Sequence, residues 1–380
     1  MRITFVLPTV NMSGGIRVVA IYARLLSARG HQVVLVSPPP LPLRFKERVQ
    51  RVFSSGANAA PRKSHVERAT LDHRVLERWR PVVDTDVPDA DVVIATWWET
   101  AEWVAALSAS KGAKVYFVQG HEVFPWLAQD RCKATYSLPM HKIVVARWLS
   151  KVMASDYADY DVDIVSNSVD HAQFHANPRG KQLRPTVGFL YSNVEIKGVD
   201  VTLRAIELLR RHVPDLRVVS FGTELPDTSI VAGIEFRHDP PQPSLRDIYA
   251  SCDVWMTASR SEGFNLPAME AMACRTPVVS TRTGWPEEVI VDGANGYCVE
   301  VDDVNALAEV AYRLLVLSDA QWRAVSDAAF DTVRERSWER SADQFEKALV
   351  RAIDRHRTKP GDRVGAPAPA SVAGQTRAFR

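Results

Sequence analysis

The sequence predicts an α/β protein made of two domains, each built on a parallel sheet covered by helices. Short apolar strands alternate with amphipathic helical stretches along most of the chain, a rhythm typical of Rossmann-like folds. The length of 380 residues exceeds the limit of about 250 at which a single hydrophobic core stops growing. Apolar residues make up 46% of the chain and charged residues 24%, the balance of a globular protein with a sizeable core.

The first half begins with a strand, because residues 1–8 hold one arginine and a short apolar run without the cleavage site of a signal peptide. A helix over 16–28 follows directly, and a second helix is expected to begin at Trp97 and Trp98. The strands expected in this half cover residues 3–7, 32–36, 91–95, 114–118, 142–145 and 163–165.

A polar stretch with proline and glycine over 177–184 separates the halves, so we divide the chain into an N-terminal domain, 1–178, and a C-terminal domain, 179–337. Expected strands of the second domain cover 186–190, 217–221, 253–257 and 277–280, and expected helices cover 199–211, 266–273, 304–317 and 320–335. A last helix, 338–356, is expected to cross back to the N-terminal domain. Residues 357–380 lack an apolar period and are predicted to be a disordered tail.

Charge and cysteine usage narrow the class of protein. A net charge of +2 is too small for a global field that would attract nucleic acid. Four scattered cysteines without CxxC spacing favour reduced thiols in the cytoplasm. No stretch approaches the roughly 20 apolar residues of a membrane-spanning helix, so any membrane contact is expected to be peripheral.

Residues 41–80 form the one strongly basic segment, with ten Lys/Arg against four Asp/Glu. Phe45, Val49, Val52 and Phe53 recur at helical spacing, which predicts a basic amphipathic helix. Two interpretations stand equal: the helix docks on anionic lipid at the inner face of the cell membrane, or its apolar side packs on the N-terminal domain.

The most informative segment runs from residue 261 to 270. Asn265 is expected to cap a helix that has Pro267 in its first turn, so that Glu262 lies before the helix and Glu270 on it. The backbone amides of Gly263, Phe264, Asn265 and Leu266 would then seat a diphosphate or sugar hydroxyls at the positive end of the helix. A capped surface helix with two incidental acids explains the same pattern equally well.

Several motifs in series resemble glycosyltransferase family 4. Glu262 and Glu270, with Gly263 and Phe264 after the first, are similar to the paired-glutamate motif of that family. The other elements that agree in order and spacing are Gly14-Gly15, His121, Asn167 to Asp170 with Phe174, Lys197-Gly198, Gly284 with Pro286-Glu287, and Asp292-Gly293 with Gly296. The resemblance covers nearly the whole chain as far as residue 355.

The resemblance implies a GT-B fold, in which two Rossmann-like domains face each other across a cleft, and a retaining transferase that uses a nucleotide-sugar donor without metal or other cofactor. It implies donor binding by Gly14, Gly15, Lys197, residues 263–266 and Glu270, and catalytic roles for Glu262, Lys197 and His121. Taken alone, Lys197-Gly198 is more often an exposed turn, Gly14-Gly15 a tight turn, and His121 a structural histidine.

The sequence departs from the family pattern at the phosphate site. The family usually carries an arginine several residues before the lysine, and residues 186–196 contain none. Phosphate charge would then rest on Lys197, on helix ends and on Arg260 or Arg282. Ser168 and Arg275 stand where glycine is common.

The Asp-x-Asp pairs, at Asp84/Asp86, Asp89/Asp91 and Asp161/Asp163, fall in loops or at strand starts and are interpreted as solvated acids rather than metal ligands. Trp97 and Trp98 either touch the acceptor or fill the core, with the core favoured.

Three functions are compatible with the sequence. The first is transfer of a hexose-type sugar to a hydroxyl of a saccharide or lipid-linked acceptor in bacterial surface polysaccharide or glycolipid synthesis. The second is a nucleotide-sugar epimerase or phosphorylase on the same fold, and the third a non-catalytic carbohydrate-binding subunit, which the missing arginine keeps open.

Overall fold

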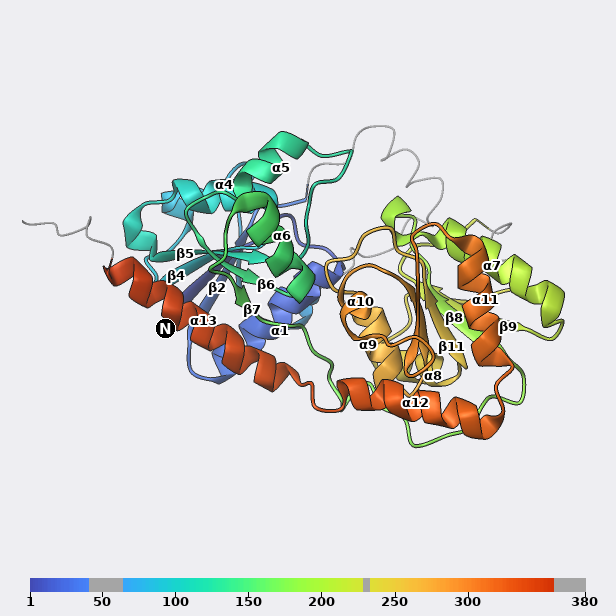
Figure 1. Ribbon diagram of the computed structural model, residues 1–380. Coiled ribbons are helices and arrows are strands. Elements are labelled where there is room, and N and C mark those ends of the chain that lie inside the picture. The colour runs from blue at the N-terminus through green and yellow to red at the C-terminus, as the bar shows by residue number, and fades with distance from the viewer. Residues whose placement is uncertain (41–63, 228–232, 359–380) are drawn as a thin grey trace, which may run out of the picture.

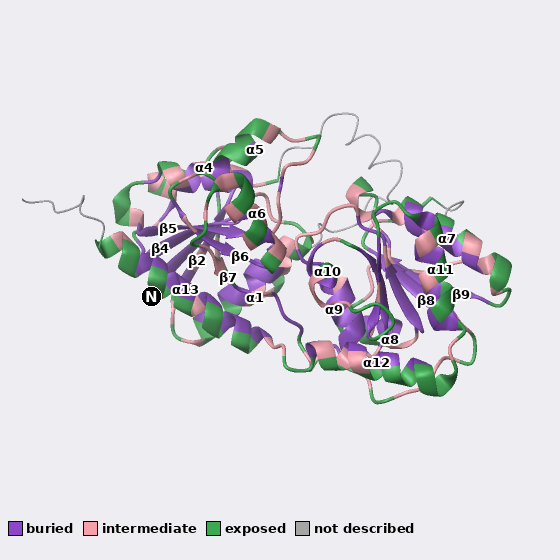
Figure 2. Cartoon of the chain, in the orientation of Figure 1, coloured by how far each residue is buried: buried purple, intermediate pink, exposed green. Residues whose placement is uncertain are grey.

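The chain folds into two lobes, each a parallel sheet between layers of helices (Figure 1). The computed structural model describes residues 1–40, 64–227 and 233–358. The predicted basic helix around residues 44–53, and the predicted tail beyond residue 358, therefore lie outside the described residues. Buried strands form the centre of both lobes and the helices expose their outer faces (Figure 2).

The N-terminal sheet has seven strands in the order β3-β2-β1-β4-β5-β6-β7, all paired in parallel. These strands are β1 (Arg2–Val6), β2 (Gln32–Ser37), β3 (Asp72–Val75), β4 (Val92–Ala95), β5 (Ala113–Val118), β6 (His141–Val144) and β7 (Asp163–Ile164). The helices of this lobe are α1 (Gly14–Ala28), α3 (His65–Arg68), α4 (Trp98–Ala106), α5 (Gln129–Thr135) and α6 (Arg147–Tyr157).

The C-terminal sheet has six parallel strands in the order β10-β9-β8-β11-β12-β13. They are β8 (Thr186–Leu190), β9 (Arg217–Gly222), β10 (Glu235–His238), β11 (Val254–Thr257), β12 (Val278–Thr281) and β13 (Gly296–Val299). The helices are α7 (Val199–His212), α8 (Leu245–Ala250), α9 (Leu266–Ala273), α10 (Trp285–Val289), α11 (Val304–Leu315) and α12 (Asp319–Val333).

The prediction of an α/β fold with two parallel sheets is confirmed. Three strands were missed: β3, β10 and β13. The first two are edge strands with mostly polar, exposed residues, so they lack the apolar run by which a buried strand is found. The third is only four residues long and begins at Gly296.

The last helix, α13 (Trp338–Thr358), leaves the C-terminal lobe and lies along the N-terminal one (Figure 1). Its apolar face enters the N-terminal core through Phe345, which is fully buried and stacks on Tyr22 at 4.5 Å. The helix extends to Thr358, so residues 357 and 358 are helical and do not belong to the predicted tail.

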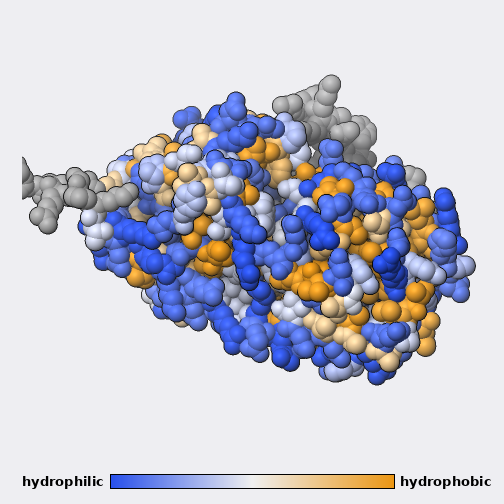
Figure 3. Space-filling model, in the orientation of Figure 1, coloured by the Kyte–Doolittle hydropathy of each residue, from blue (hydrophilic) through white to orange (hydrophobic). Residues whose placement is uncertain are grey.

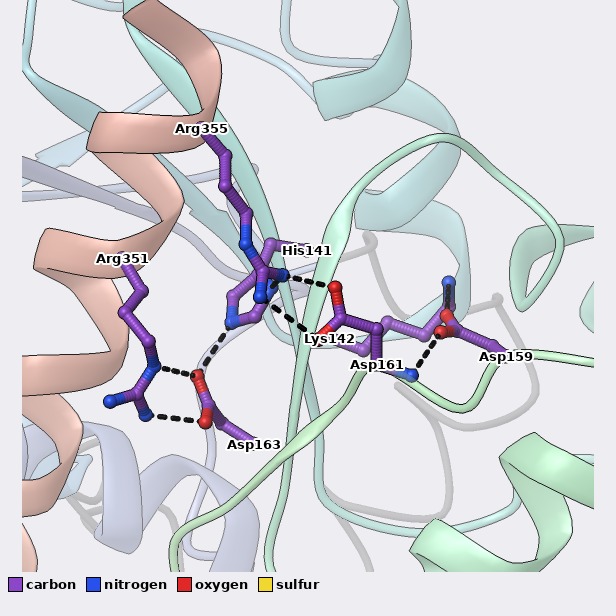
Figure 4. Close-up of polar contacts among 7 residues, drawn as sticks. All are labelled: His141, Lys142, Asp159, Asp161, Asp163, Arg351 and Arg355. Atoms are coloured by element: carbon purple, nitrogen blue, oxygen red, sulfur yellow. Dashed lines mark hydrogen bonds and ion pairs between the residues drawn. The ribbon is translucent and has the colours of Figure 1, made fainter. Parts of the chain in front are cut away.

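The polar face of α13 pairs with acids at the start of β7 (Figure 4). Arg351 donates through Nε to Asp163 at 3.0 Å, and Arg355 pairs with Asp161 at 2.6 Å. His141 bonds the same Asp163 carboxylate at 2.8 Å. Beside them Lys142 pairs with Asp159 at 2.6 Å.

The chain crosses between the lobes in two segments that lie side by side. Ser341, early in α13, donates to the carbonyl of Ser166 at 2.7 Å and lies 2.8 Å from the Ser168 hydroxyl. His171 contacts the carbonyl of Val333 at 3.2 Å, just before the return. Outgoing and returning segments are therefore hydrogen-bonded to each other where the lobes meet.

The outer surface is mostly hydrophilic on the face drawn in Figure 3, with apolar residues scattered over both lobes. Within the described residues, no helix is long and apolar enough to span a lipid bilayer.

Candidate active site

The helix α9 starts as the sequence predicts. Asn265 adopts a left-handed conformation, with φ of 79°, and its side-chain oxygen accepts from the amide of Ala268 at 3.3 Å. Pro267 occupies the first turn, where a missing N–H costs nothing. The side chains of Phe264 and Leu266 are buried in the core, so only their backbone is left to meet a ligand.

Lys197 and Glu262 meet in front of this helix. The Lys197 ammonium lies 2.8 Å from Oε1 of Glu262, and the Ser259 hydroxyl donates to the same oxygen at 2.7 Å. These three side chains line a small hollow together with Asn265 and Pro267.

Gly198 fixes the turn that carries Lys197. Its φ is +59°, and a Cβ at this position would lie 1.9 Å from the Ala258 carbonyl oxygen. Only glycine combines this conformation with so close an approach to the end of β11. The lysine is therefore held against the sheet edge where ligands of open α/β folds bind.

The N-terminal lobe approaches this loop through its own backbone. A Cβ on Gly263 would lie 1.7 Å from the carbonyl oxygen of Gln119 and 3.1 Å from the Cα of Gly120, both just after β5. A Cβ on Gly15 would lie 3.4 Å from the Gln119 side chain. Gly15, Gln119 and Gly263 thus follow one another across the boundary between lobes.

Trp148 strengthens this boundary. Its indole N–H donates to the Gly263 carbonyl at 2.9 Å, and its backbone amide donates to Glu288 at 2.8 Å. With the backbone contact of Gly263, these bonds hold the two lobes closed over the loop that precedes α9.

Glu270 is covered by an arginine of the opposite lobe. Arg17, one turn into α1, donates to Oε1 of Glu270 at 2.7 Å, and the Tyr249 hydroxyl donates to Oε2 at 2.8 Å. Glu270 is only 3% exposed. The predicted donor-binding carboxylate therefore contacts the helix that Gly14 begins, through Arg17, and both of its oxygens are engaged.

His121 lies in the loop that continues from Gly120. Its Nε2 is 2.7 Å from the Tyr157 hydroxyl, and its ring packs against Tyr136. Burial lowers the pKa of His121, so the neutral imidazole is favoured at pH 7. No contact joins this side chain to Lys197 or Glu262 among the described residues.

The arginines named as substitute phosphate ligands are committed elsewhere. Arg260 pairs with Asp200 and Asp302, both at 2.7 Å. Arg282 pairs with Asp292 and Glu300 at 3.4 and 3.1 Å. Either arginine would have to leave its acidic partners before its charge could be paired with a phosphate.

The Asp-x-Asp acids have partners of their own. Asp86, Asp89, Asp91, Asp161 and Asp163 form ion pairs with basic side chains, and Asp84 accepts from the amide of Ser108. Trp98 is buried at the start of α4, in agreement with a core role.

Sequence reasoning missed Arg17, Tyr249, Gln119 and Trp148. Only Arg17 gave a local signal, since it is a basic residue two positions after the glycine pair. The others become neighbours of the site through tertiary packing alone.

Comparison with known proteins agrees with this geometry. Residues 184–316 match the family described as Glycosyl transferases group 1. The chain is 32% identical to D-inositol 3-phosphate glycosyltransferase of Arthrobacter sp., over 54% of each chain. It is 33% identical to the GDP-mannose-dependent alpha-(1-6)-phosphatidylinositol monomannoside mannosyltransferase of Mycolicibacterium smegmatis, over 35% of this chain and 39% of the relative. The matches therefore span about half or less of these relatives.

Solved structures share the whole architecture. Sucrose-phosphate synthase from Thermosynechococcus elongatus superposes with a TM-score of 0.72 at 15% identity, over 93% of this chain and 100% of the other. Anabaena HepE in complex with UDP-glucose gives 0.70 at 14% identity, over 92% and 100%. Both sheets and the crossing helix recur in these structures, so the chain has the GT-B fold, and its residues 184–316 are similar to the group 1 glycosyltransferases.

Proposed function

We propose that the protein is a retaining glycosyltransferase that moves a hexose-type sugar from a nucleoside-diphosphate donor to a hydroxyl of a saccharide or lipid-linked acceptor. The observation that carries this proposal is the Lys197–Glu262 pair before α9, next to Gly263, whose backbone meets Gln119 of the other lobe. Relatives named as inositol phosphate and mannosyl transferases, and the Anabaena neighbour bound to UDP-glucose, support the choice of substrates.

The chemistry follows from where charge develops. Breaking the anomeric bond leaves additional negative charge on the departing diphosphate, which the Lys197 ammonium and the amides before α9 would stabilise. The closed lobes would align donor and acceptor and exclude water. Glu262, which contacts Lys197, would meet the sugar, and the proposed reaction would proceed without a metal or another cofactor.

Donor binding is tested by thermal unfolding against a panel of nucleotide sugars. A donor that binds only the folded state raises the melting temperature, by mass action.

Slow release of nucleoside diphosphate without acceptor would then distinguish a transferase from a non-catalytic subunit. NMR of the product anomer tests retention, and we expect EDTA to leave the rate unchanged. No stabilisation by any nucleotide sugar would refute the proposal.

Membrane attachment through residues 41–80 is proposed as the way this enzyme reaches a lipid-linked acceptor at the cytoplasmic face of a bacterial membrane. The segment carries six excess positive charges, which attract anionic lipid. We expect deletion of residues 44–53 to reduce co-sedimentation with anionic vesicles without lowering the melting temperature. Unchanged sedimentation would show that the segment serves the fold and not the membrane.

A further inference from the structure

The contact between Arg17 and Glu270 joins the two lobes inside the candidate donor site. Glu270 comes from α9 of the C-terminal lobe and is buried. The Arg17 guanidinium reaches it from the first turn of α1 in the N-terminal lobe, with Nη1 2.7 Å from Oε1. Since Tyr249 holds the other oxygen, a ligand hydroxyl has no open route to this carboxylate while the arginine is in place.

Arg17 has hydrogen-bonding capacity to spare. A guanidinium carries five N–H donors, and among the described contacts of Arg17 only Nη1 has an acceptor. Its side chain is 18% exposed, and the Phe174 ring lies 5.6 Å from its central carbon. The remaining N–H groups have no acceptor among the described contacts, so they are available to a ligand.

The other candidate phosphate cations are Lys197, Arg260 and Arg282. Lys197 is paired with one acid, Glu262, whereas Arg260 and Arg282 each serve two acids. Arg17 serves one acid and starts on the turn that follows Gly14 and Gly15. A phosphate bound at those glycines would therefore lie beside the turn that carries Arg17.

We propose that Arg17 is a donor-binding residue that changes partner: it leaves Glu270 for the diphosphate and so uncovers Glu270 for the hydroxyls of the nucleotide ribose. This inference rests on the proposed function. The exchange keeps both charges satisfied, because the guanidinium moves from a carboxylate to phosphate oxygens and Glu270 retains Tyr249 while it gains hydroxyl donors. The same arginine would thus cover the buried carboxylate before the exchange and hold the donor after it.

Affinity measurements with paired ligands test the exchange. Calorimetry compares the nucleoside and the nucleoside diphosphate of whichever base stabilises the wild type. We expect Arg17→Ala to weaken diphosphate binding about 10- to 100-fold, the range for a lost charged hydrogen bond. Nucleoside affinity should stay the same or rise, because Glu270 is no longer covered. Arg24→Ala, an exposed position on the same helix, should change neither affinity.

A second variant gives the mirror image. Glu270→Gln removes the charge that retains Arg17, so nucleoside affinity should fall while the additional affinity contributed by the diphosphate is kept or increased. This variant also serves if Arg17→Ala does not fold. Equal weakening of both ligands by Arg17→Ala, or no weakening of the diphosphate, would overturn the exchange. A wild type that binds no nucleoside diphosphate would instead refute the proposed function, and the exchange with it.

Discussion

At the scale of single residues, Lys197 shows how neighbouring groups fix the position of a positive charge. Glu262 and Ser259 fix the end of the lysine side chain, and Gly198 fixes the backbone behind it. In the proposed transfer, a cation held in this way would need little reorganisation when negative charge develops on the leaving diphosphate.

Lys197→Ala should lower kcat about 10²- to 10³-fold, the usual loss for one stabilising group in a transition state. The melting temperature should change little, because the side chain is one third exposed at 32%. Steady-state kinetics and thermal unfolding check both expectations, with the exposed Lys151→Ala as the control. Wild-type turnover in the Lys197 variant would remove this residue from the site.

His65, which lies next to the glycine loop, makes the free energy of unfolding depend on pH. Burial, and then the charge of Arg17, lower its pKa to about 4. The unfolded chain takes up this proton near pH 6.5, so it binds more protons than the folded protein between pH 6.5 and 4. The free energy of unfolding should therefore fall as pH drops through that window.

His65→Gln should reduce this loss of stability, since glutamine does not titrate. Urea unfolding at pH 7.5 and pH 5 measures the difference, with the exposed His175→Gln as the control. An identical pH dependence in wild type and His65→Gln would contradict the assignment.

Prediction from sequence works for these residues where the chemistry is local. Asn265 and Pro267 mark the start of α9 because capping is decided within a few positions. The Arg17–Glu270 contact joins residues 253 positions apart, and no local pattern of the chain encodes it. The covering of Glu270 therefore could not be predicted.

At the scale of elements, α13 shows which forces dock a helix on a distant lobe. Phe345 is fully buried among Tyr22, Phe5 and Phe117, whereas the Arg351 side chain is 48% exposed. Burial of a large aromatic ring contributes several times more to the free energy of unfolding than an exposed ion pair does.

Phe345→Ala should therefore lower the free energy of unfolding by about 3–5 kcal/mol. Arg351→Ala should lower it by less than about 1 kcal/mol. Guanidinium unfolding measures both, and Val350→Ala, a 44% exposed position on the same helix, provides the control. A larger effect of Arg351 than of Phe345 would reverse this order of forces.

The elements that sequence analysis found are those with strong internal periodicity. Buried strands such as β1 and β8 were placed to within a residue, because parallel strands covered on both faces are continuously apolar. β3 and β10 form because they pair with β2 and β9, respectively. Their own residues are mostly polar.

At the scale of the whole molecule, closure depends on backbone contact between the lobes. Gly263→Ala would place a methyl group 1.7 Å from the Gln119 carbonyl oxygen, so the lobes should be forced apart. We expect a larger radius of gyration by X-ray scattering and a lower kcat. Gly14→Ala, which has open space around its Cβ, should leave the radius unchanged. An unchanged radius in Gly263→Ala would show that the loop yields instead of the lobes.

The paired crossings of the chain between the lobes have a mechanical consequence. Hydrogen bonds join the outgoing and returning segments, one between Ser341 and Ser166 and one between His171 and Val333. Two neighbouring connections of this kind favour rotation of the lobes about one axis and resist sliding or twisting of one lobe against the other. Gly263 and Gln119 lie where the two lobes make backbone contact, so a rotation about this axis would change the separation between them.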